Sequence, residues 1–300
     1  MRCVAGPMHM TTLKTRDILA LGFMTFALFL GAGNIIFPPM VGMAAGQNLL
    51  GASTGFLLTG VGLPLLGVVA LARVGGGLDT LTRPIGRTAG LILAIAIYLT
   101  IGPFFATPRT ATVSFEMGLA PFVGNTPAML LIFTIVYFVL VALLSLFPGK
   151  LMDNVGKIIT PVLILALAVL GGSAFLAPAG GYSVSTEAYA TQGAAFAEGF
   201  LQGYQTMDAL ASLIFGLVIV NAIKAAGVTD GKLHTRYCIY AGIIAATCLG
   251  LVYVSLMYLG ATNSQLAANA TTGVQILTAF VQQTFGPAGL WLLAVVIMLA

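Results

Sequence analysis

Charged residues are scarce in this chain of 300 residues: Asp, Glu, Lys and Arg together make up 7% of it. An ordinary soluble domain has about 25% charged residues, which cover its surface. The low proportion therefore excludes a soluble globular domain of this length. Apolar residues make up 59% of the chain. They are grouped in runs of about 20 residues, the length that crosses a hydrocarbon core about 30 Å thick. The sequence thus predicts an all-α, polytopic transmembrane helix bundle in a lipid bilayer.

Residues that bind metals or phosphates are also scarce. The two histidines, His9 and His234, lie far apart in the sequence and cannot form an H-E-x-x-H metal pair. Cys3, Cys238 and Cys248 lack the spacing of a metal or redox site. The sequence contains no G-x-x-x-x-G-K-[ST] loop, so direct use of ATP is unsupported. We expect no cofactor, and any energy-dependent process would have to draw on an ion gradient.

The net charge of +4 is informative through the placement of the basic residues. The predicted intervening loops, near 118–127, 177–198 and 260–287, contain no Lys or Arg. Cytoplasmic loops of membrane proteins are enriched in Lys and Arg, so this alternation predicts a cytoplasmic N-terminus and no nucleic-acid partner. Eleven of the twelve basic residues form four clusters: Arg2, Lys14 and Arg16; Arg73, Arg83 and Arg87; Lys150 and Lys157; Lys224, Lys232 and Arg236.

Eight apolar segments lie between the charged residues and the helix breakers. They cover about 17–40, 50–72, 88–117, 126–147, 156–177, 198–223, 236–260 and 287–300. The first seven are long enough to span a bilayer. The eighth reaches Ala300 within its apolar run, so we expect the chain to be truncated in helix 8. The predicted division is a cytoplasmic tail over 1–15 and one transmembrane domain over 16–300.

The first segment is interrupted near its middle. Gly31 and Gly33 lower the cost of non-helical backbone, and Pro38 and Pro39 remove two helical amides. We expect free backbone oxygens here, with Asn34 as the cap of a second half-helix. The interruption lies ~20–25 Å from the cytoplasmic end of the segment. Irregular backbone at that depth is tolerated only where it lines a cavity or is buried in protein.

The sixth segment carries a second interruption, GYQTMDALAS, over residues 203–212. Asp208 would lie ~15 Å below the outer end of the segment if the residues between are helical. A carboxylate at that depth is costly unless it has partners or water. Gln205, Asp208 and Ser212 would share one face if the stretch stayed helical. The alternative is that Asp208 is a turn residue in an outer loop.

Interruptions in the first and sixth segments are typical of five helices followed by an inverted copy of themselves. The first repeat would cover about 17–177, and a partial second repeat about 198–300. Discontinuous helices at matching positions mark a midplane site for substrate and coupling ion. The N-termini of the half-helices attract a carboxylate, and free carbonyls at their C-termini bind Na⁺. The alternative for the glycines is close packing between helices.

Three stretches carry a family resemblance: LGFMTFALFLGAGNIIFPPMVG (21–42), GPFFATPRTATVSFEMG (102–118) and the GYQTMDALAS run. From about residue 16 onward the chain closely resembles the bacterial branched-chain amino acid:cation symporters. The resemblance implies the five-plus-five inverted-repeat fold with discontinuous helices 1 and 6. It also implies import of leucine, isoleucine and valine with Na⁺ across the bacterial inner membrane. Hydroxyl ligands that the eighth helix supplies in that fold would follow Ala300, so we expect an incomplete sodium site.

The site predicted on this basis joins the two interruptions. Na⁺ would bind the backbone carbonyls of Gly31 and Asn34. An apolar pocket near the breaks could include Phe26, Phe29, Phe37 or Phe215, each of which could instead face lipid or the core. The residues predicted to bind the substrate are Gly31, Ala32, Gly33, Asn34, Tyr204, Gln205, Thr206 and Asp208.

Arg109 is the one basic residue outside the four clusters. It would lie ~33 Å along its segment from the cytoplasmic end, toward the outer side. One hypothesis is a gate formed by Arg109 with Glu116 or Asp208 as its partner. The alternative is an arginine at a helix end whose side chain extends to the membrane interface.

Other functions remain open from the sequence alone. A channel would need rings of like charge or a repeated carbonyl filter, and neither pattern is present in the sequence. A membrane enzyme would need several titratable groups at one depth, so we expect no enzyme. A transporter for another small solute, or a fragment that does not transport, also fits. The preferred substrate, the coupling ion and the oligomeric state are not determined by the sequence.

Overall fold

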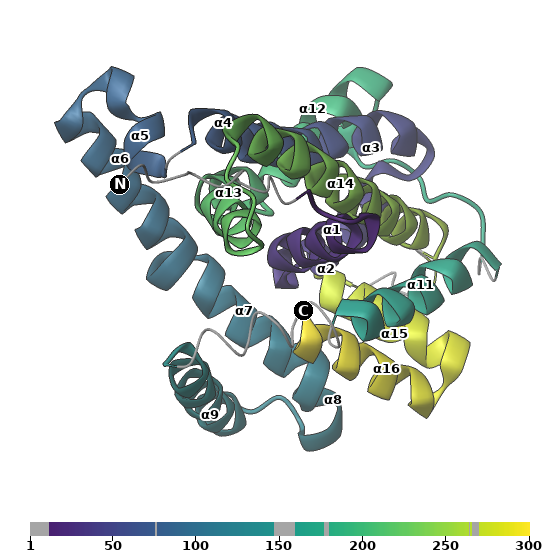
Figure 1. Ribbon diagram of the computed structural model, residues 1–300. Coiled ribbons are helices and arrows are strands. Elements are labelled where there is room, and N and C mark those ends of the chain that lie inside the picture. The colour runs from purple at the N-terminus through teal and green to yellow at the C-terminus, as the bar shows by residue number, and fades with distance from the viewer. Residues whose placement is uncertain (1–11, 76, 147–159, 177–179, 264, 266–269) are drawn as a thin grey trace, which may run out of the picture.

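The computed structural model describes residues 12–75, 77–146, 160–176, 180–263, 265 and 270–300 (Figure 1). These residues form helices joined by short connections, and none of them lies in a β-strand. The chain is therefore an all-α, multi-pass membrane protein, as its composition predicts. Arg2, Lys150, Lys157 and the start of the predicted segment 156–177 lie outside the described residues. Five helical stretches among those described are long and apolar enough to cross a membrane: Ala32–Val74, Arg87–Val123, Pro127–Ser145, Asp208–Ala225 and Gly231–Thr262.

The first predicted segment is two helices, α1 (Thr15–Phe29) and α2 (Ala32–Ala45). Leu30 and Gly31 between them have extended backbone, which confirms the predicted interruption. The chain turns at Gly46, where φ is +48° and where a Cβ atom would overlap the carbonyl oxygen of Ser183. Only glycine fits both constraints. The run continues through η1 (Gly46–Asn48), α3 (Leu49–Leu57), the π-helical turn η2 (Leu58–Gly62) and α4 (Leu63–Val74).

The third predicted segment is bent and forms a diagonal arm beside the bundle in Figure 1. The backbone of Gly102 is not helical (φ −78°, ψ −114°), one residue before Pro103. No residue of the following α9 is fully buried, and most of the apolar surface of this helix is exposed. The elements of this region are α5 (Leu78–Leu81), η3 (Arg83–Ile85), α6 (Arg87–Leu99), η4 (Thr100–Phe104), α7 (Ala106–Ser114), η5 (Phe115–Leu119), α8 (Ala120–Val123) and α9 (Pro127–Ser145).

The sixth predicted segment is also two helices, α12 (Gln192–Tyr204) and α13 (Asp208–Ala225). Its interruption is confirmed as well. The long α14 (Gly231–Thr262) follows it, and α11 (Thr160–Leu176), η7 (Glu187–Tyr189) and α16 (Pro287–Leu299) complete this part of the fold. Whether the two interrupted helices belong to inverted repeats stays a prediction.

The stretch 260–287 was predicted to be a loop, and for about half of its length this prediction is wrong. It contains α15 (Gly273–Phe285). A search for apolar runs of about 20 residues misses this helix, because Gln and Thr interrupt the run. Val274, Leu277 and Val281 nevertheless recur at helical spacing, and all three are buried.

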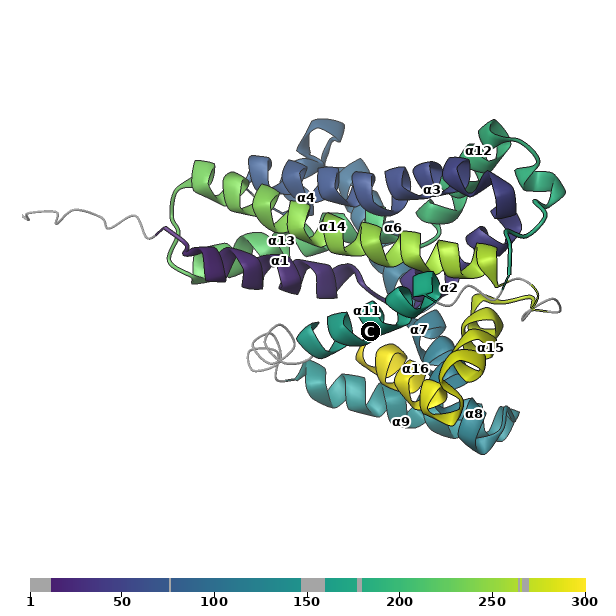
Figure 2. The same cartoon turned by 90° about the vertical axis from the view of Figure 1, so that its right-hand side faces the viewer.

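Helix α14 lies at the centre of the bundle and packs against α1, α2, α4 and α11 (Figure 2). It crosses α2 at backbone contact distance: a Cβ atom at Gly42 would overlap the carbonyl of Met257, and one at Gly260 would overlap the carbonyl of Pro39. Such close backbone contacts at small residues are common where helices associate in lipid. The crossing fixes the position of α14 relative to the first interruption.

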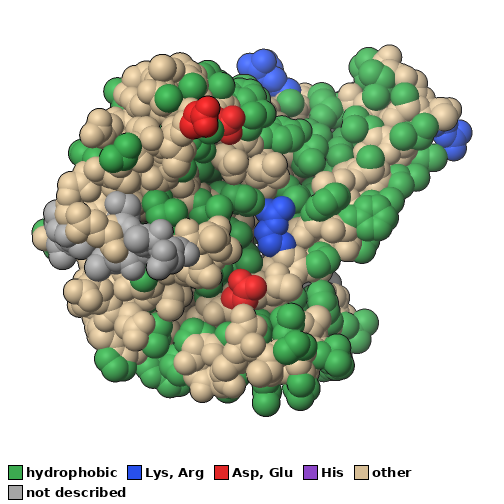
Figure 3. All heavy atoms as spheres, turned by 180° about the vertical axis from the view of Figure 1, so that it is seen from behind, with side chains coloured by type: hydrophobic (Ala, Val, Ile, Leu, Met, Phe, Trp, Pro, Cys, Tyr) green, Lys and Arg blue, Asp and Glu red, His purple; other side chains and the backbone are tan. Residues whose placement is uncertain are grey.

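Figure 3 shows that few Lys, Arg, Asp or Glu side chains interrupt the hydrophobic and neutral surface on the back of the molecule. This distribution agrees with helices that face acyl chains.

Candidate functional site

A pocket of about 120 Å³ lies where the two helix interruptions meet, and we call it the break pocket. It is lined by Leu28, Phe29, Gly31, Ala32, Gly33, Asn34, Ile101, Ala106, Arg109, Thr110, Thr206, Met207, Asp208, Ala211 and Phe215. These residues come from α1, α2 and the connection between them, the bent third segment, α13, and the connection from α12 to α13. The fold therefore brings together residues as far apart in the sequence as Leu28 and Phe215.

The first interruption is organised by Asn34. Its side-chain Oδ1 accepts a hydrogen bond from the backbone N–H of Gly31 at 3.1 Å, and the backbone N–H of Asn34 donates to the Gly31 carbonyl at 3.0 Å. Asn34 thus caps the second half-helix, as predicted, but it does so from the third position inside α2, and Gly31 occupies the N-cap position. The helix also continues through Pro38 and Pro39, so the break lies at Leu30 and Gly31. Because Pro38 has no N–H, the carbonyl of Asn34 still lacks its usual helical partner.

The second interruption is a single tight turn. Met207 has φ +66°, the only left-handed backbone at a residue other than glycine in the described part of the chain. This conformation costs ~1–2 kcal/mol for an ordinary residue, and such strain is concentrated at functional sites. The hydroxyl of Thr206 donates to the carbonyl of Gly203 at 2.8 Å. Asp208 is consequently the first residue of α13, with its side chain beside the turn.

Asp208 and Asn34 meet in the interior, together with Tyr253 from α14. The Asn34 amide nitrogen Nδ2 donates to Asp208 Oδ2 at 2.6 Å and also to the hydroxyl of Tyr253. The Tyr253 hydroxyl in turn donates to the same Asp208 oxygen at 2.8 Å. Asn34, Asp208 and Tyr253 are 2%, 4% and 0% exposed, respectively. This burial rules out an exposed outer turn for Asp208. We call these residues the buried triad.

Tyr253 was not identified from the sequence. It lies inside the apolar segment 236–260, where the sequence does not distinguish a functional tyrosine from one that only packs in the interior. A signal exists in retrospect, because a buried tyrosine hydroxyl needs a hydrogen-bond partner. The partner itself, 45 residues away, could be found only from the fold.

The predicted substrate-binding residues divide into two groups. Gly31, Ala32, Gly33, Asn34, Thr206 and Asp208 all line the break pocket. Tyr204 is 46% exposed, and the side chain of Gln205 is exposed as well, so neither is part of the lining. Gln205, Asp208 and Ser212 do not form one helical face, because the turn at Met207 separates the first from the other two.

Arg109 lies at the level of the interruptions, and its predicted place toward the outer side is wrong. Its Nη1 donates to the carbonyl of Gln205 at 3.0 Å, and its guanidinium lies over the Phe37 ring, 5.2 Å from the centroid. The prediction treated the third segment as a straight helix, whereas the bend at Gly102 redirects the chain. Among the described residues, no carboxylate lies within ion-pair distance of Arg109.

Glu116 faces a different space, a cavity of about 590 Å³ whose walls combine polar and apolar side chains. The cavity lies between the end of the third segment and one face of α15, which contributes Gln275, Thr278 and Gln282. The predicted pairing of Arg109 with Glu116 is therefore absent from this structure. A gating role for either residue stays a prediction.

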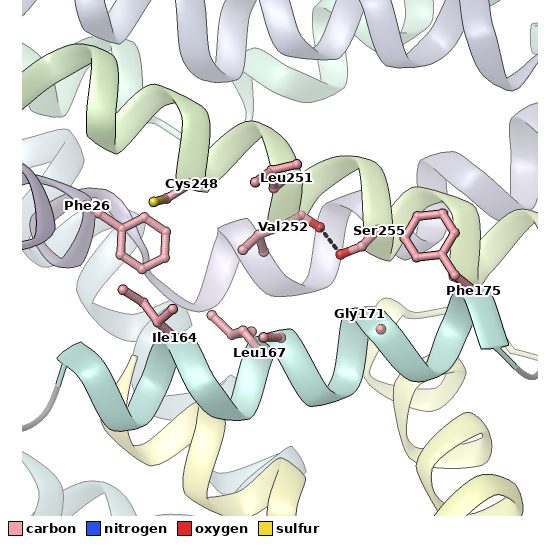
Figure 4. A pocket seen from close by; sticks show the side chains of 11 residues that line it. Phe26, Ile164, Leu167, Gly171, Phe175, Cys248, Leu251, Val252 and Ser255 are labelled. Carbon is pink, nitrogen blue, oxygen red and sulfur yellow. Dashed lines mark hydrogen bonds between the residues drawn. The ribbon is translucent and has the colours of Figure 1, made fainter.

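A further cavity, of about 270 Å³, is lined by α1, α11 and α14 and is almost entirely apolar (Figure 4). Phe26 faces this cavity, whereas Phe29 and Phe215 line the break pocket. The Ser255 hydroxyl is already bonded to the Val252 carbonyl at 2.8 Å. Unlike this apolar cavity, the break pocket has polar and charged groups that an ion or a charged small molecule would need.

Helix termini supply the remaining polar groups of the break pocket. The first amides of a helix and its last carbonyls have no partner within the helix. The pocket therefore combines the amides at the starts of α2 and α13 with the carbonyls at the end of α1. Within the described residues, no three His, Cys, Asp or Glu side chains are grouped as for a transition-metal site. Any cation in this pocket would depend on backbone carbonyls and Asp208.

Comparison with known proteins agrees with this architecture. Residues 14–300 match the family described as "Branched-chain amino acid transport protein". The chain is 64% identical over 291 residues to the branched-chain amino acid transport system 2 carrier protein of Pseudomonas aeruginosa, covering 97% of this chain and 66% of that protein. It is 54% identical over 288 residues to the branched-chain amino acid permease BrnQ of Escherichia coli K12, covering 96% of this chain and 65% of the permease.

A third relative is the branched-chain amino acid permease BraB of Bacillus subtilis, 47% identical over 280 residues, with 93% of this chain and 62% of the permease covered. The chain thus spans slightly less than two thirds of the length of these relatives. The family match over residues 14–300 covers the positions of both interruptions and of the buried triad. The chain belongs to the branched-chain amino acid transport protein family.

Proposed function

We propose that the protein imports leucine, isoleucine and valine with Na⁺ and that the break pocket is the binding site. One observation carries the proposal: the pocket joins unpaired helix termini, a buried carboxylate and a guanidinium to apolar walls. An amino-acid zwitterion with an aliphatic side chain needs this combination of groups. The names of the three relatives, a carrier and two permeases for branched-chain amino acids, support the same substrates.

The substrate carboxylate would lie at the positive N-terminus of α2, next to the amides of Ala32 and Gly33, with Arg109 nearby. The ammonium would lie toward the Asp208 carboxylate and the last carbonyls of α1. Phe29, Ile101 and Phe215 would surround the branched side chain. Each part of the ligand thus has a complementary group within one small pocket.

Sodium would be the coupling ion. The carbonyls of Gly31 and Asn34 are suitable ligands, because Na⁺ prefers oxygen and the Asn34 carbonyl has no helical partner. Alternating access would proceed by movement of the two interrupted helices, which we assign to inverted repeats, relative to the rest of the bundle. In this proposal the protein lies in the bacterial inner membrane with a cytoplasmic N-terminus, as the basic clusters favour.

The test is uptake of radiolabelled leucine by membrane vesicles that contain the full-length protein. We expect saturable accumulation driven by an inward Na⁺ gradient, competition by isoleucine and valine, and a lower half-saturating concentration in sodium than in choline buffer. Equal affinity in the two buffers would reject the coupling to sodium. Flux that does not saturate would favour a channel, and the absence of competition would point to another solute.

A further inference from the structure

Tyr253 touches both interrupted helices without belonging to either. It lies in α14, and its hydroxyl accepts a hydrogen bond from Asn34 of α2 and donates one to Asp208 of α13. Asn34 in turn holds the amide of Gly31, the residue at the first break. A continuous chain of hydrogen bonds therefore runs from α14 through both breaks. Tyr253 itself is absent from the lining of the break pocket.

The Tyr253 ring is held as firmly as its hydroxyl. It is completely buried and meets the ring of Phe56 edge to face, with centroids 5.2 Å apart. Gly60 of the π-helical turn η2 lies against the same two rings, since a Cβ atom there would be 3.4 Å from Tyr253 Cε2. Helix α14 is fixed to α2 by the backbone contacts at Gly42 and Gly260. The hydroxyl consequently has one defined position in the interior.

We propose that Tyr253 is a positioning residue for the substrate site, an inference that rests on the proposed function. Its hydroxyl fixes the Asn34 amide group and the Asp208 carboxylate relative to α14. These two side chains set the geometry of the first break and of the start of α13, both of which line the break pocket. Displacing catalytic or binding groups by about 1 Å costs much of their effect. Removing the hydroxyl should therefore weaken substrate binding without disturbing the apolar packing.

The experiment compares Tyr253→Phe with Tyr237→Phe in the full-length protein. Tyr237 is the matched control: it is a buried tyrosine of the same helix, and its hydroxyl accepts a hydrogen bond from the amide of Leu13 at 3.1 Å, far from the pocket. We expect Tyr253→Phe to raise the KM for leucine about tenfold, the effect of losing one buried bond to a charged group. The maximal rate per folded protein should change less than threefold. Tyr237→Phe should leave KM unchanged.

A second pair of variants keeps the hydroxyl and moves only the ring. A methyl group at Gly60 would press on Phe56 and Tyr253, whereas one at Gly62 in the same turn would meet nothing closer than 3.7 Å. We expect Gly60→Ala to raise KM about threefold, since the neighbouring rings must shift by tenths of an ångström, and Gly62→Ala to have no effect. This pair decides the question if Tyr253→Phe does not fold.

Two results would overturn the positioning role. One is a KM for Tyr253→Phe within twofold of the wild type, with leucine raising its melting temperature as much as it raises that of the wild type. The other is an equal rise in KM for the Tyr237 or Gly62 controls, which would indicate a general loss of packing. Failure of the proposed function is distinguishable from both, because the wild type would then show no saturable leucine uptake.

Discussion

The break pocket and the contact between α3 and α12 are both rich in glycine, but the glycines have opposite surroundings. Along the α3–α12 contact, a Cβ atom at Gly55 would overlap the carbonyl of Phe196, and one at Gly199 would overlap the carbonyl of Ala52. At the break, a Cβ atom at Gly31 would meet only Asn34 Oδ1, at 3.6 Å. In the first region glycine admits a neighbouring helix. In the second it leaves space beside free backbone groups, where a ligand can bind.

The different surroundings distinguish the two roles of glycine that the sequence left open, helix packing and ligand binding. A glycine required for packing should be needed for folding, and a glycine beside a ligand should be needed for binding. Four substitutions follow in order of decreasing effect. Two replace a glycine, one in each region, and two replace a charged residue of the break pocket.

Gly199→Ala should have the largest effect, because its methyl group meets backbone that cannot rotate away. Helices α3 and α12 would have to separate, with a cost at or above the upper end of the ~1–3 kcal/mol typical of overpacking. We expect little folded protein in the membrane and a lower melting temperature in detergent. Gly193→Ala in the same helix is the control, since nothing lies within 4 Å of its Cβ position. If both variants fold equally well, the α3–α12 contact does not depend on glycine.

Asp208→Asn should abolish uptake while the protein still folds. The amide is nearly the same size as the carboxylate, but it lacks the negative charge that would face the substrate ammonium. The same charge accepts hydrogen bonds from Asn34 and Tyr253. We expect leucine uptake to fall at least ~100-fold, as when a buried bond to a charged group is lost at a binding site. Initial rates normalised to the folded protein would show it. Rates close to the wild type would remove Asp208 from the site.

Gly31→Ala should fold normally and bind leucine more weakly. The backbone of Gly31 (φ −130°, ψ −176°) suits any residue, so the methyl group costs little in the empty protein. It would occupy part of a pocket of about 120 Å³. We expect the KM for leucine to rise about tenfold, as for overpacking by one methyl group, and the KM for valine to rise less. Equal KM values for wild type and variant would argue that leucine binds elsewhere.

Arg109→Ala should have the smallest of the four effects. Its guanidinium is half-buried and hydrogen-bonded to the carbonyl of Gln205. A contact between this partly exposed charge and the substrate would be worth ~1 kcal/mol, or about fivefold in KM. Arg236→Ala, which removes an exposed arginine of α14, provides the control. Leucine uptake and sodium dependence that both stay unchanged in Arg109→Ala would exclude the gate as well as a contact with the substrate.

Both interruptions could be predicted because they depend on residues that are close together in the sequence. Gly31, Asn34 and Asp208 are residues that an apolar transmembrane helix does not need, so their presence at mid-segment marks a departure from regular structure. Their depth could be estimated from the rise per residue only where the helix is straight. That condition fails at Gly102, and the predicted position of Arg109 was wrong for this reason. Helix α15 was missed because its buried residues alternate with Gln and Thr.

The sequence by itself determined the membrane class and the places where two helices break, because run length, scarcity of charge and helix-breaking residues are properties of neighbouring positions. Only the tertiary structure decided which groups meet at the breaks. Asn34, Asp208 and Tyr253 come from α2, α13 and α14, and no local pattern reports a hydrogen bond across 174 or 219 residues. The same holds for the glycines: identical residues serve packing or binding according to what the fold places opposite them.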